Sequence, residues 1–195
     1  MKRGKLSRIC IALGLILILG AGALLLWQNN REKSARVDAA AILQKTLSQL
    51  PPAVDAVPEV RGNNRMSSRQ IDGVDVIGVL EFPLQGRTLP LAGDWNTNRV
   101  SYMPCRFTGS IYDSSLIIGA VDGQDQIPFA GTLEVGDEVV LTDMEGGRYH
   151  YSVAAIHHAK HATRNKLQQG DYPLTVFVKD SQSGQYLLIR CEIGK

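Results

Sequence analysis

The sequence has almost no net charge, few cysteines and few aromatic residues, and each shortage narrows the possible functions. Its 195 residues include 21 lysines and arginines against 19 aspartates and glutamates, and the basic residues form no continuous stripe. This balance argues against a nucleic-acid partner, because such proteins concentrate positive charge on one surface. The three cysteines include no closely spaced pair, and no glycine-rich phosphate loop is present. A zinc site and a nucleotide site are therefore disfavoured, and we expect no cofactor.

Aromatic residues make up only 6% of the chain, whereas glycine occurs 19 times. A composition with many glycines and few aromatic residues favours strands joined by tight turns over a helical bundle. The length is suited to one globular domain with additional terminal segments.

Charge is also missing from residues 10–27, an uninterrupted run of 18 uncharged and mostly apolar residues. As a helix this run would be about 27 Å long, close to the ~30 Å hydrocarbon core of a bilayer. Basic residues precede it at four positions: Lys2, Arg3, Lys5 and Arg8. They predict a cytoplasmic N-terminus, although Arg31, Lys33 and Arg36 after the run reduce the charge asymmetry.

A cleaved signal peptide is the alternative interpretation of residues 10–27. The run is long for the apolar core of a signal peptide, and Ala21-Gly22-Ala23 is followed by further leucines. We therefore predict a single-pass anchor in the plasma membrane, with a cytoplasmic basic tail at residues 1–9 and an extracellular domain.

Residues 28–70 are predicted to form an amphipathic helix followed by a linker. Apolar residues recur at three- and four-residue steps between residues 34 and 50: Val37, Ala40, Leu43, Leu47 and Leu50. This spacing predicts a helix with one apolar face, and Pro51-Pro52 ends it. Such a face usually packs on its own domain, while a stalk and a partner-binding helix are the alternatives. Residues 51–70 are polar and rich in turn formers, which is typical of a linker.

Residues 71–195 have the pattern of an all-β domain. Short apolar or alternating segments predict strands at residues 76–82, 89–91, 116–118, 137–142, 148–154, 174–178 and 186–193. The segments 137–142 and 148–154 are expected to pair as a hairpin. Many short strands with glycine turns favour a closed or nearly closed β-barrel of seven to eight strands with short helices.

Three of these segments resemble, in order and spacing, the catalytic strands of the sortases, the cysteine transpeptidases of Gram-positive cell surfaces. They are Leu116–Ala120, Leu174–Lys179 and Tyr186–Cys191. The resemblance extends over about residues 75–193, and further landmarks similar to clostridial-type sortases lie at residues 78–83, 89–91, 104–110, 136–139 and 190–192. It implies a sortase-like β-barrel.

The residues that perform the family's reaction are replaced in this chain. In sortases the first segment ends in Gly-His, the second ends in Thr-Cys and the third begins with Arg; here these positions hold Ala120, Lys179 and Tyr186. The family mechanism needs a thiolate nucleophile, a histidine that protonates the leaving amine, and an arginine that stabilises the oxyanion. Ala120 transfers no proton, Lys179 is a cation and Tyr186 carries no charge. The resemblance therefore implies a pseudosortase with no catalytic residues of the family mechanism.

Such a protein is expected to bind LPXTG-like sorting-signal peptides, pilin or other surface proteins, or an active sortase. Two alternatives remain open, namely an enzyme with a non-standard nucleophile and a structural scaffold of the cell envelope. The replacement nucleophiles to consider are Cys105, Cys191 and Lys179.

Other polar clusters are interpreted structurally. Residues 157–161, with three histidines, are predicted to form a solvated surface loop, although metal binding is the alternative. Residues 122–128 include Asp122, Gly123 and Asp125 but lack the spacing of a calcium loop, so we interpret them as a turn. Cys105 and Cys191 permit one disulfide, and two half-buried thiols are the preferred interpretation.

Overall fold

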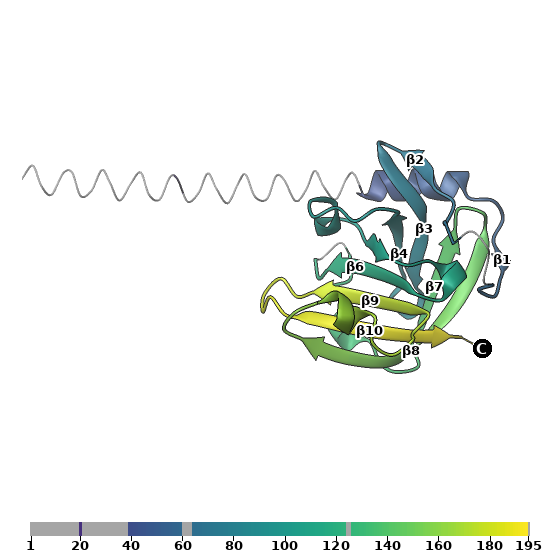
Figure 1. The fold of residues 1–195 in the computed structure, drawn as a ribbon. Helices are drawn as coiled ribbons and strands as arrows, with labels where there is room; N and C mark the ends of the chain where they lie inside the picture. Colours follow the sequence, from purple (N-terminus) through teal and green to yellow (C-terminus); the bar gives the residue numbers. More distant parts are fainter. Residues whose placement is uncertain (1–19, 21–38, 60–63, 124–125, 195) are drawn as a thin grey trace, which may run out of the picture. The chain divides into compact units, whose positions relative to one another are not determined.

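Eight strands close into a barrel in which each strand is hydrogen-bonded to two neighbours (Figure 1). The circuit runs β3–β4–β5–β6–β9–β10–β8–β7 and returns to β3, because β7 pairs with both β3 and β8. The strands are β3 (Val74–Phe82), β4 (Arg87–Ala92), β5 (Cys105–Thr108), β6 (Leu116–Val121), β7 (Glu138–Asp143), β8 (Gly147–Ala159), β9 (Leu174–Lys179) and β10 (Tyr186–Ile193). The predicted all-β class and the barrel of seven to eight strands are confirmed.

The structure is a computed structural model that describes residues 20, 39–59, 64–123 and 126–194. Apart from Gly20, the predicted tail at residues 1–9 and the predicted membrane anchor at residues 10–27 lie outside the described residues. Within the part of the chain that the structure describes, no helix has the length and apolar character needed to cross a membrane.

Two short strands lie within residues 51–71, most of which were interpreted as a linker. Strand β1 (Val54–Asp55) pairs in parallel with β8, and β2 (Arg69–Ile71) pairs with β3. Both belong, with the helix at residues 39–49, to the compact unit Ala39–Lys195. The remaining helical turns are short: η1 (Pro83–Gln85), η2 (Arg99–Ser101), η3 (Ile111–Asp113), η4 (Ala130–Thr132) and α2 (Arg164–Leu167).

The helix at residues 39–49 packs on the outside of the barrel, but not through the predicted stripe. Ile42 is buried in a cluster with Ile71 and Met103, and Thr46 is also buried. The Thr46 hydroxyl donates a hydrogen bond of 2.7 Å to the Ile42 carbonyl, so its burial leaves no unpaired donor. Leu47, by contrast, is about half exposed. The apolar repeat identified the helix correctly but misplaced its buried face.

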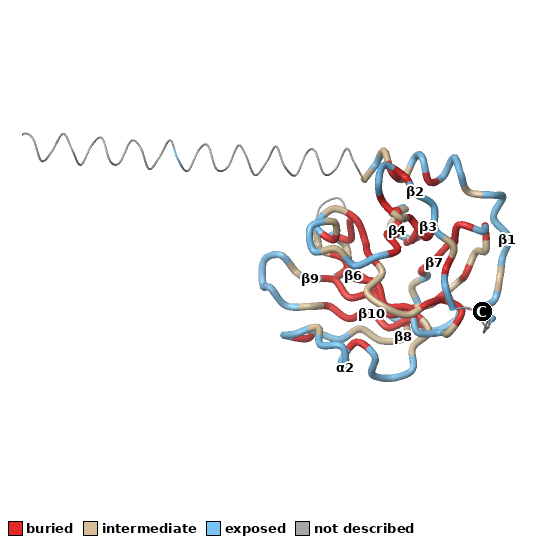
Figure 2. Tube along the Cα trace, turned by 45° about the horizontal axis from the view of Figure 1, so that its top comes forward, coloured by how far each residue is buried: buried red, intermediate tan, exposed pale blue. Residues whose placement is uncertain are grey.

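Strands β6 and β9 are almost wholly apolar because both of their faces are covered. They pair in parallel, from Leu116 opposite Leu174 to Val121 opposite Lys179. One face of each lies in the interior core, and the other lies under an outer apolar cluster. Figure 2 shows both strands buried over most of their length. Alternate side chains of these strands therefore belong to the interior core and to the outer cluster.

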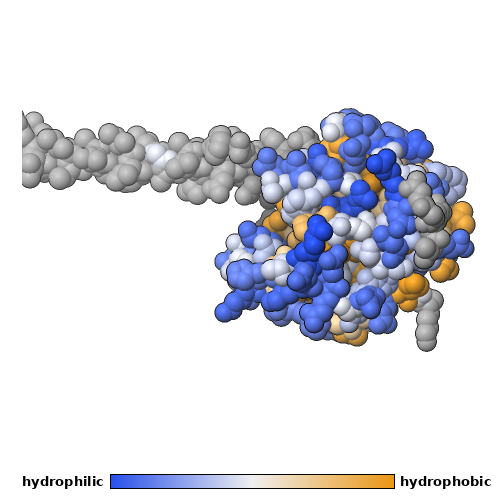
Figure 3. Space-filling model, viewed as in Figure 1, coloured by the Kyte–Doolittle hydropathy of each residue, from blue (hydrophilic) through white to orange (hydrophobic). Residues whose placement is uncertain are grey.

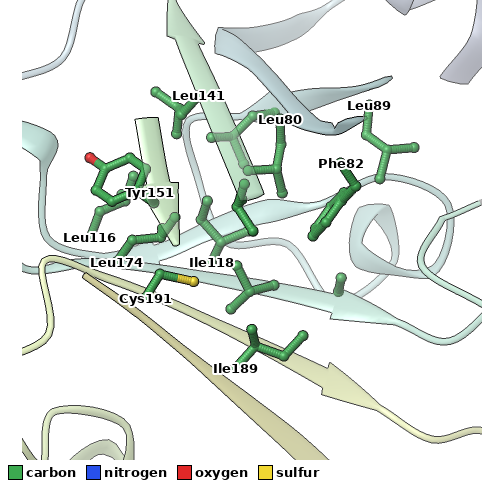
Figure 4. Packing of buried hydrophobic residues seen from close by; sticks show 14 of the residues in the cluster. Leu80, Phe82, Leu89, Leu116, Ile118, Leu141, Tyr151, Leu174, Ile189 and Cys191 are labelled. Atoms are coloured by element: carbon green, nitrogen blue, oxygen red, sulfur yellow. The ribbon is translucent and has the colours of Figure 1, made fainter. Parts of the chain in front are cut away.

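The barrel interior is filled by apolar side chains from every strand of the circuit except β5. Figure 4 shows Leu80, Phe82, Leu116, Ile118, Leu141, Tyr151, Leu174, Ile189 and Cys191 meeting there. Asp143 closes the β7–β8 hairpin, since its Oδ1 accepts hydrogen bonds from the amides of Glu145 and Gly147, both at 2.9 Å. Its Oδ2 accepts from the hydroxyls of Tyr112 and Tyr149, so the buried carboxylate is well satisfied.

Candidate functional site

The three positions that the sequence resemblance matches to the sortase catalytic residues lie on adjacent strands. Lys179, the last residue of β9, is directly opposite Tyr186, the first residue of β10. On the other side of β9, Lys179 is opposite Val121 of β6, and Ala120 is opposite Val178. The backbone of Ala120 is therefore one residue away from the row that contains Lys179 and Tyr186.

The side chains of these three positions do not share one face. Ala120 is only 2% exposed and belongs to the interior core with Val178 and Leu187. Because side chains alternate along a strand, Lys179 projects to the outside, where it is exposed, and Tyr186 lies half-buried on that same outer face. The structure thus brings Lys179 and Tyr186 together and separates Ala120 from them by the thickness of the sheet.

Four aromatic rings cover the outer face beside Lys179; we call Trp95, Phe107, Phe177 and Tyr186 the aromatic cluster. The ring centroids of Trp95 and Phe107 lie 5.3 Å apart, those of Trp95 and Phe177 5.7 Å, and those of Phe107 and Phe177 5.6 Å. Tyr186 extends the cluster, with its centroid 6.3 Å from that of Phe177. Offset and edge-to-face contacts of this kind stabilise the arrangement beyond the area that they bury.

Gly119 of β6 makes room for this cluster. A Cβ atom at this position would lie 2.4 Å from Cζ3 of Trp95 and 2.5 Å from Cζ of Phe177. Sequence reasoning identified Gly119 only as part of a strand, and it missed Trp95 because that residue stands in a polar loop without periodicity. The only sequence signal was an isolated glycine within an apolar strand, which indicates a close approach by another group.

Neither cysteine in the described part of the chain is suited to act as a nucleophile. Cys105 and Cys191 are free thiols with no exposed surface, more deeply buried than the half-buried thiols that we expected. Burial raises the pKa of Cys105 to about 11 and that of Cys191 to about 12. Figure 4 shows the Cys191 sulfur among interior side chains. Both thiols therefore stay protonated at neutral pH, and a thiol is a far weaker nucleophile than a thiolate.

The histidines lie on β8 or shortly after it. The prediction of a loop at residues 157–161 is wrong in part, because β8 continues through Ala159 and includes His157 and His158. Both are exposed, as is His161. Among the residues that the structure describes, no group of three or more His, Cys, Asp or Glu side chains is placed to hold a metal ion.

His150 lies on the outer face of β8 and joins three strands. Its Nδ1 is 2.7 Å from Oε1 of Glu138 on β7, and its Nε2 is 3.1 Å from Oδ1 of Asp55 on β1. The hydrogen bonds to Glu138 and Asp55 raise the pKa of His150. This arrangement stabilises the imidazolium form and fastens β1 to the barrel.

The turn after β6 is tied to the turn after β9. The carboxylate of Asp122 accepts a hydrogen bond of 2.7 Å from the hydroxyl of Ser181. Asp180 stabilises its own turn by accepting hydrogen bonds from the amides of Gln182 and Ser183, at 2.8 Å and 3.1 Å. Asp122 thus has a structural partner, in keeping with a turn, while Asp125 lies outside the described residues.

Arg190 is a buried residue of the outer face whose role the sequence did not indicate. It is 4% exposed, and its guanidinium donates to the carbonyls of Lys166 and Leu167 and, at 2.9 Å, to Oγ1 of Thr175. These bonds hold α2 against β9 and β10. Because the guanidinium is already committed, Arg190 positions α2 and is not a free anion-binding group.

A pocket of about 440 Å³ lies elsewhere, between residues 47–53 and the outer face of β3, β7 and β8. Its polar lining includes Glu81, Thr142 and Arg148, with 3.5 Å between Nη2 of Arg148 and Oε2 of Glu81. None of the three positions Ala120, Lys179 and Tyr186 lines it.

Comparison with solved structures supports the fold. A sortase C from Clostridium perfringens SM101 superposes with a TM-score of 0.53 at 18% identity, covering 62% of this chain and 71% of that one. Clostridium perfringens sortase C with the C-terminal cell wall sorting motif gives a TM-score of 0.56 at 18% identity, with 72% and 79% covered. A lid mutant of sortase A from Corynebacterium diphtheriae gives 0.54 at 16% identity, with 86% and 95% covered.

The chain has the sortase fold. No protein-family model and no curated protein matches the sequence. At identities of 16–18% the similarity to these sortases establishes the fold and not the activity. The function must therefore be argued from the residues of the outer face.

Proposed function

We propose that this protein is a membrane-anchored, outward-facing sortase-fold protein that recognises peptides and does not catalyse transpeptidation. The observation that carries the proposal is the division of the three catalytic positions between the two faces of the sheet. Ala120 lies in the interior core, whereas Lys179 and Tyr186 lie on the outer face. A proton donor and a nucleophile must be within hydrogen-bond reach of one substrate, which this arrangement does not permit.

The candidates for a replacement nucleophile give no support to an enzyme. Lys179 is exposed and has no catalytic base beside it among its cross-strand neighbours, Val121 and Tyr186. An amine acts as a nucleophile only when deprotonated, which requires desolvation or a neighbouring cation. Cys105 and Cys191 have raised pKa values and are enclosed by apolar residues.

Peptide recognition is favoured by the aromatic cluster. Trp95 is 37% exposed, and both Trp95 and the half-buried Tyr186 pack against Phe177. Partly exposed aromatic rings are the residues that most often anchor a bound partner. One solved relative of the fold is described with a cell wall sorting motif, which supports a peptide of that kind as one ligand to test here. Pilin or surface proteins and an active sortase are the corresponding protein partners.

The membrane anchor in this proposal rests on residues 10–27 of the sequence. The basic residues before this run favour a cytoplasmic N-terminus and an extracellular domain in the plasma membrane. Protease added to intact cells should therefore remove the domain but leave an N-terminal epitope tag protected. Loss of the tag together with the domain, or protection of both, would contradict this topology.

The proposed function is tested with the full-length chain in detergent micelles. We expect no turnover of a fluorogenic LPXTG-type peptide with an amine acceptor above the protein-free blank, and saturable binding of the same peptide by calorimetry. A peptide of the same composition in scrambled order is the matched control. Turnover would refute the inactive assignment, whereas equal or absent binding of both peptides would refute recognition.

A second candidate, a structural scaffold, is favoured by one observation. Phe177 is only 4% exposed because Trp95 and Phe107 cover it, so part of the outer face is already occupied by the protein's own side chains. If no peptide binds saturably, and if the chain remains in the membrane fraction with partner proteins after crosslinking, the scaffold is the better description.

A further inference from the structure

Unpaired cations are concentrated next to the aromatic cluster. Between residues 157 and 180 the sequence has four lysines and arginines and two carboxylates, Asp171 and Asp180. The cations are Lys160, Arg164, Lys166 and Lys179. All four are exposed. Within the described ranges, the recorded ion pairs and side-chain hydrogen bonds include none of these four side chains. In a chain whose net charge is only +2, these four side chains are a local concentration of basic groups.

The strand register places these basic groups beside the rings. Ala159 of β8 is opposite Tyr186 of β10, which is opposite Lys179 of β9. Lys160 directly follows Ala159 and therefore lies at the same end of the barrel as Lys179. Figure 3 shows hydrophilic residues over the end of the molecule at which the β9–β10 turn lies in Figure 1.

The segment that carries Arg164 and Lys166 is fixed against this surface. Leu167 of α2 is buried in the same outer cluster as Phe177 and Ala159. The guanidinium of Arg190 fixes the C-terminal end of α2 by donating hydrogen bonds to the carbonyls of Lys166 and Leu167. Figure 2 shows the surroundings of α2 largely exposed. Arg164 and Lys166 are therefore carried by a helix that is fixed against the outer apolar cluster.

The nearest carboxylates form their hydrogen bonds within the turns and not with these cations. Asp180 accepts hydrogen bonds within its own turn from Gln182 and Ser183, and Asp122 accepts from Ser181. Both carboxylates keep their negative charge, and hydrogen bonds from Ser183 and Gln182 lower the pKa of Asp180. Counted with Asp171, they leave an excess of one positive charge over the four cations' surface.

We propose that the aromatic cluster and the four bordering cations form a binding surface for an acidic peptide. The inference rests on the proposed function, because it names the ligand class for the same outer face. An apolar side chain of the peptide contacts Trp95 and Tyr186, and carboxylates on either side of it meet Lys179 and Lys160. Opposite charges at the rim of such a surface steer the encounter and select the partner.

The exposure of the rings favours a peptide over a lipid surface. Membrane-surface binding requires apolar side chains that project beyond the charged groups and enter the headgroup region. Here Phe177 is 4% exposed, Phe107 and Tyr186 are half-buried, and Trp95 is 37% exposed, so none of the rings is fully exposed at the surface. A ligand must reach down to them, as a single side chain of an extended peptide does.

The test uses the fluorescence of Trp95 in the full-length chain. The sequence has two tryptophans, so Trp27→Phe leaves Trp95 as the single reporter. Three peptides share one apolar centre and differ only in flanking Glu, Gln or Lys residues. Exposed ion pairs contribute ~0.2–1 kcal/mol each, or roughly 1.5- to 5-fold in Kd. With two pairs formed, we expect the Glu peptide to bind roughly 2- to 25-fold more tightly than the Gln peptide, and high salt to reduce this ratio.

Two variants locate the effect. Lys179→Gln is expected to lower the ratio of the Kd of the Gln peptide to that of the Glu peptide by roughly 1.5- to 5-fold. Arg69→Gln is the matched control, since Arg69 is an exposed cation on β2, far along the sheet from β9. Neither exposed substitution is expected to change stability by more than ~0.5 kcal/mol.

The outcomes separate the two proposals. Equal affinity for the Glu and Gln peptides, unaffected by Lys179→Gln, would overturn the acidic ligand while leaving peptide recognition intact. Absence of saturable binding by all three peptides would overturn both. Vesicles of anionic phosphatidylglycerol are the remaining arm: a Trp95 response to vesicles that exceeds the response to the Glu peptide would replace the peptide with a lipid surface.

Discussion

The position of Ala120 in the interior core makes its replacement by histidine a direct test of the structure. In a sortase alignment Ala120→His restores a catalytic residue, whereas here it places an imidazole among Val178 and Leu187. Overpacking a core position costs about 1–3 kcal/mol. Leaving a buried ring nitrogen without a hydrogen-bond partner costs about 1–3 kcal/mol more. We therefore expect Ala120→His to lower the free energy of unfolding by roughly 2–6 kcal/mol, a large part of the ~5–15 kcal/mol typical of a domain.

The assay is urea unfolding followed through Trp95 in the Trp27→Phe background. A loss of ~2 kcal/mol or more corresponds to a decrease in the urea midpoint of about 1 M. Val121→His is the matched control, because Val121 is the next residue of β6 and is half-buried on the opposite face. We expect a smaller loss there. If Ala120→His is as stable as the parent and its imidazole titrates as an exposed group, the assignment of faces is refuted.

The same reasoning extends to the triple variant Ala120→His, Lys179→Cys and Tyr186→Arg. It restores the three residue types of the family, but position 120 stays on the interior face while positions 179 and 186 stay on the outer face, so we expect no turnover of an LPXTG-type peptide. Measurable turnover would show that the three side chains can meet and would contradict the register described here.

Three further predictions concern single side chains. Gly119→Ala forces Trp95 away from β6, and we expect a loss of roughly 1–3 kcal/mol and a red shift of Trp95 emission; an unchanged spectrum would contradict the close contact. Arg190→Gln releases α2, so amide hydrogen exchange should rise at residues 160–173 while the barrel strands stay protected; uniform exchange would argue against a local role. His150 has a raised pKa in the folded protein, so its stabilising effect is complete below the ordinary histidine pKa of 6.5 and is lost as the pH rises through the raised value. The stability difference between the parent and His150→Gln should therefore be largest at acidic pH, and a difference that grows with pH would refute the interaction with Asp55.

The central strands could be predicted from the sequence because a strand that is buried on both faces consists almost entirely of apolar residues. Residues 116–121 and 174–178 are apolar throughout since both faces are buried, and continuous apolar runs of this length indicate central strands. Their order and spacing also carried the resemblance to sortases, which the solved structures confirm at the level of the fold.

The site could be predicted only in part. The resemblance to sortases implied that Ala120, Lys179 and Tyr186 lie together, and the register places Lys179 and Tyr186 directly opposite each other. The resemblance could not indicate the face of Ala120, because a shift of one residue moves every side chain of a strand to the other side of the sheet. Trp95 was missed for another reason: its ring partners, Phe107 and Phe177, come from two other segments of the chain, and no local sequence pattern indicates such contacts.

The attachment of β1 has a mechanical consequence. β1 lies outside the closed circuit and is joined to the β8 side by backbone hydrogen bonds from Val54 to Gly146, at 2.9 Å, and from Ala56 to Arg148, at 2.8 Å. A pulling force that enters from the N-terminal side reaches the helix at residues 39–49 and β1 before any strand that is flanked on both sides. Residues 39–59, once peeled away, would span about 70 Å when extended at ~3.3 Å per residue, while the barrel stays closed. The helix at residues 39–49 and β1 would therefore detach under load before the closed circuit of strands opens.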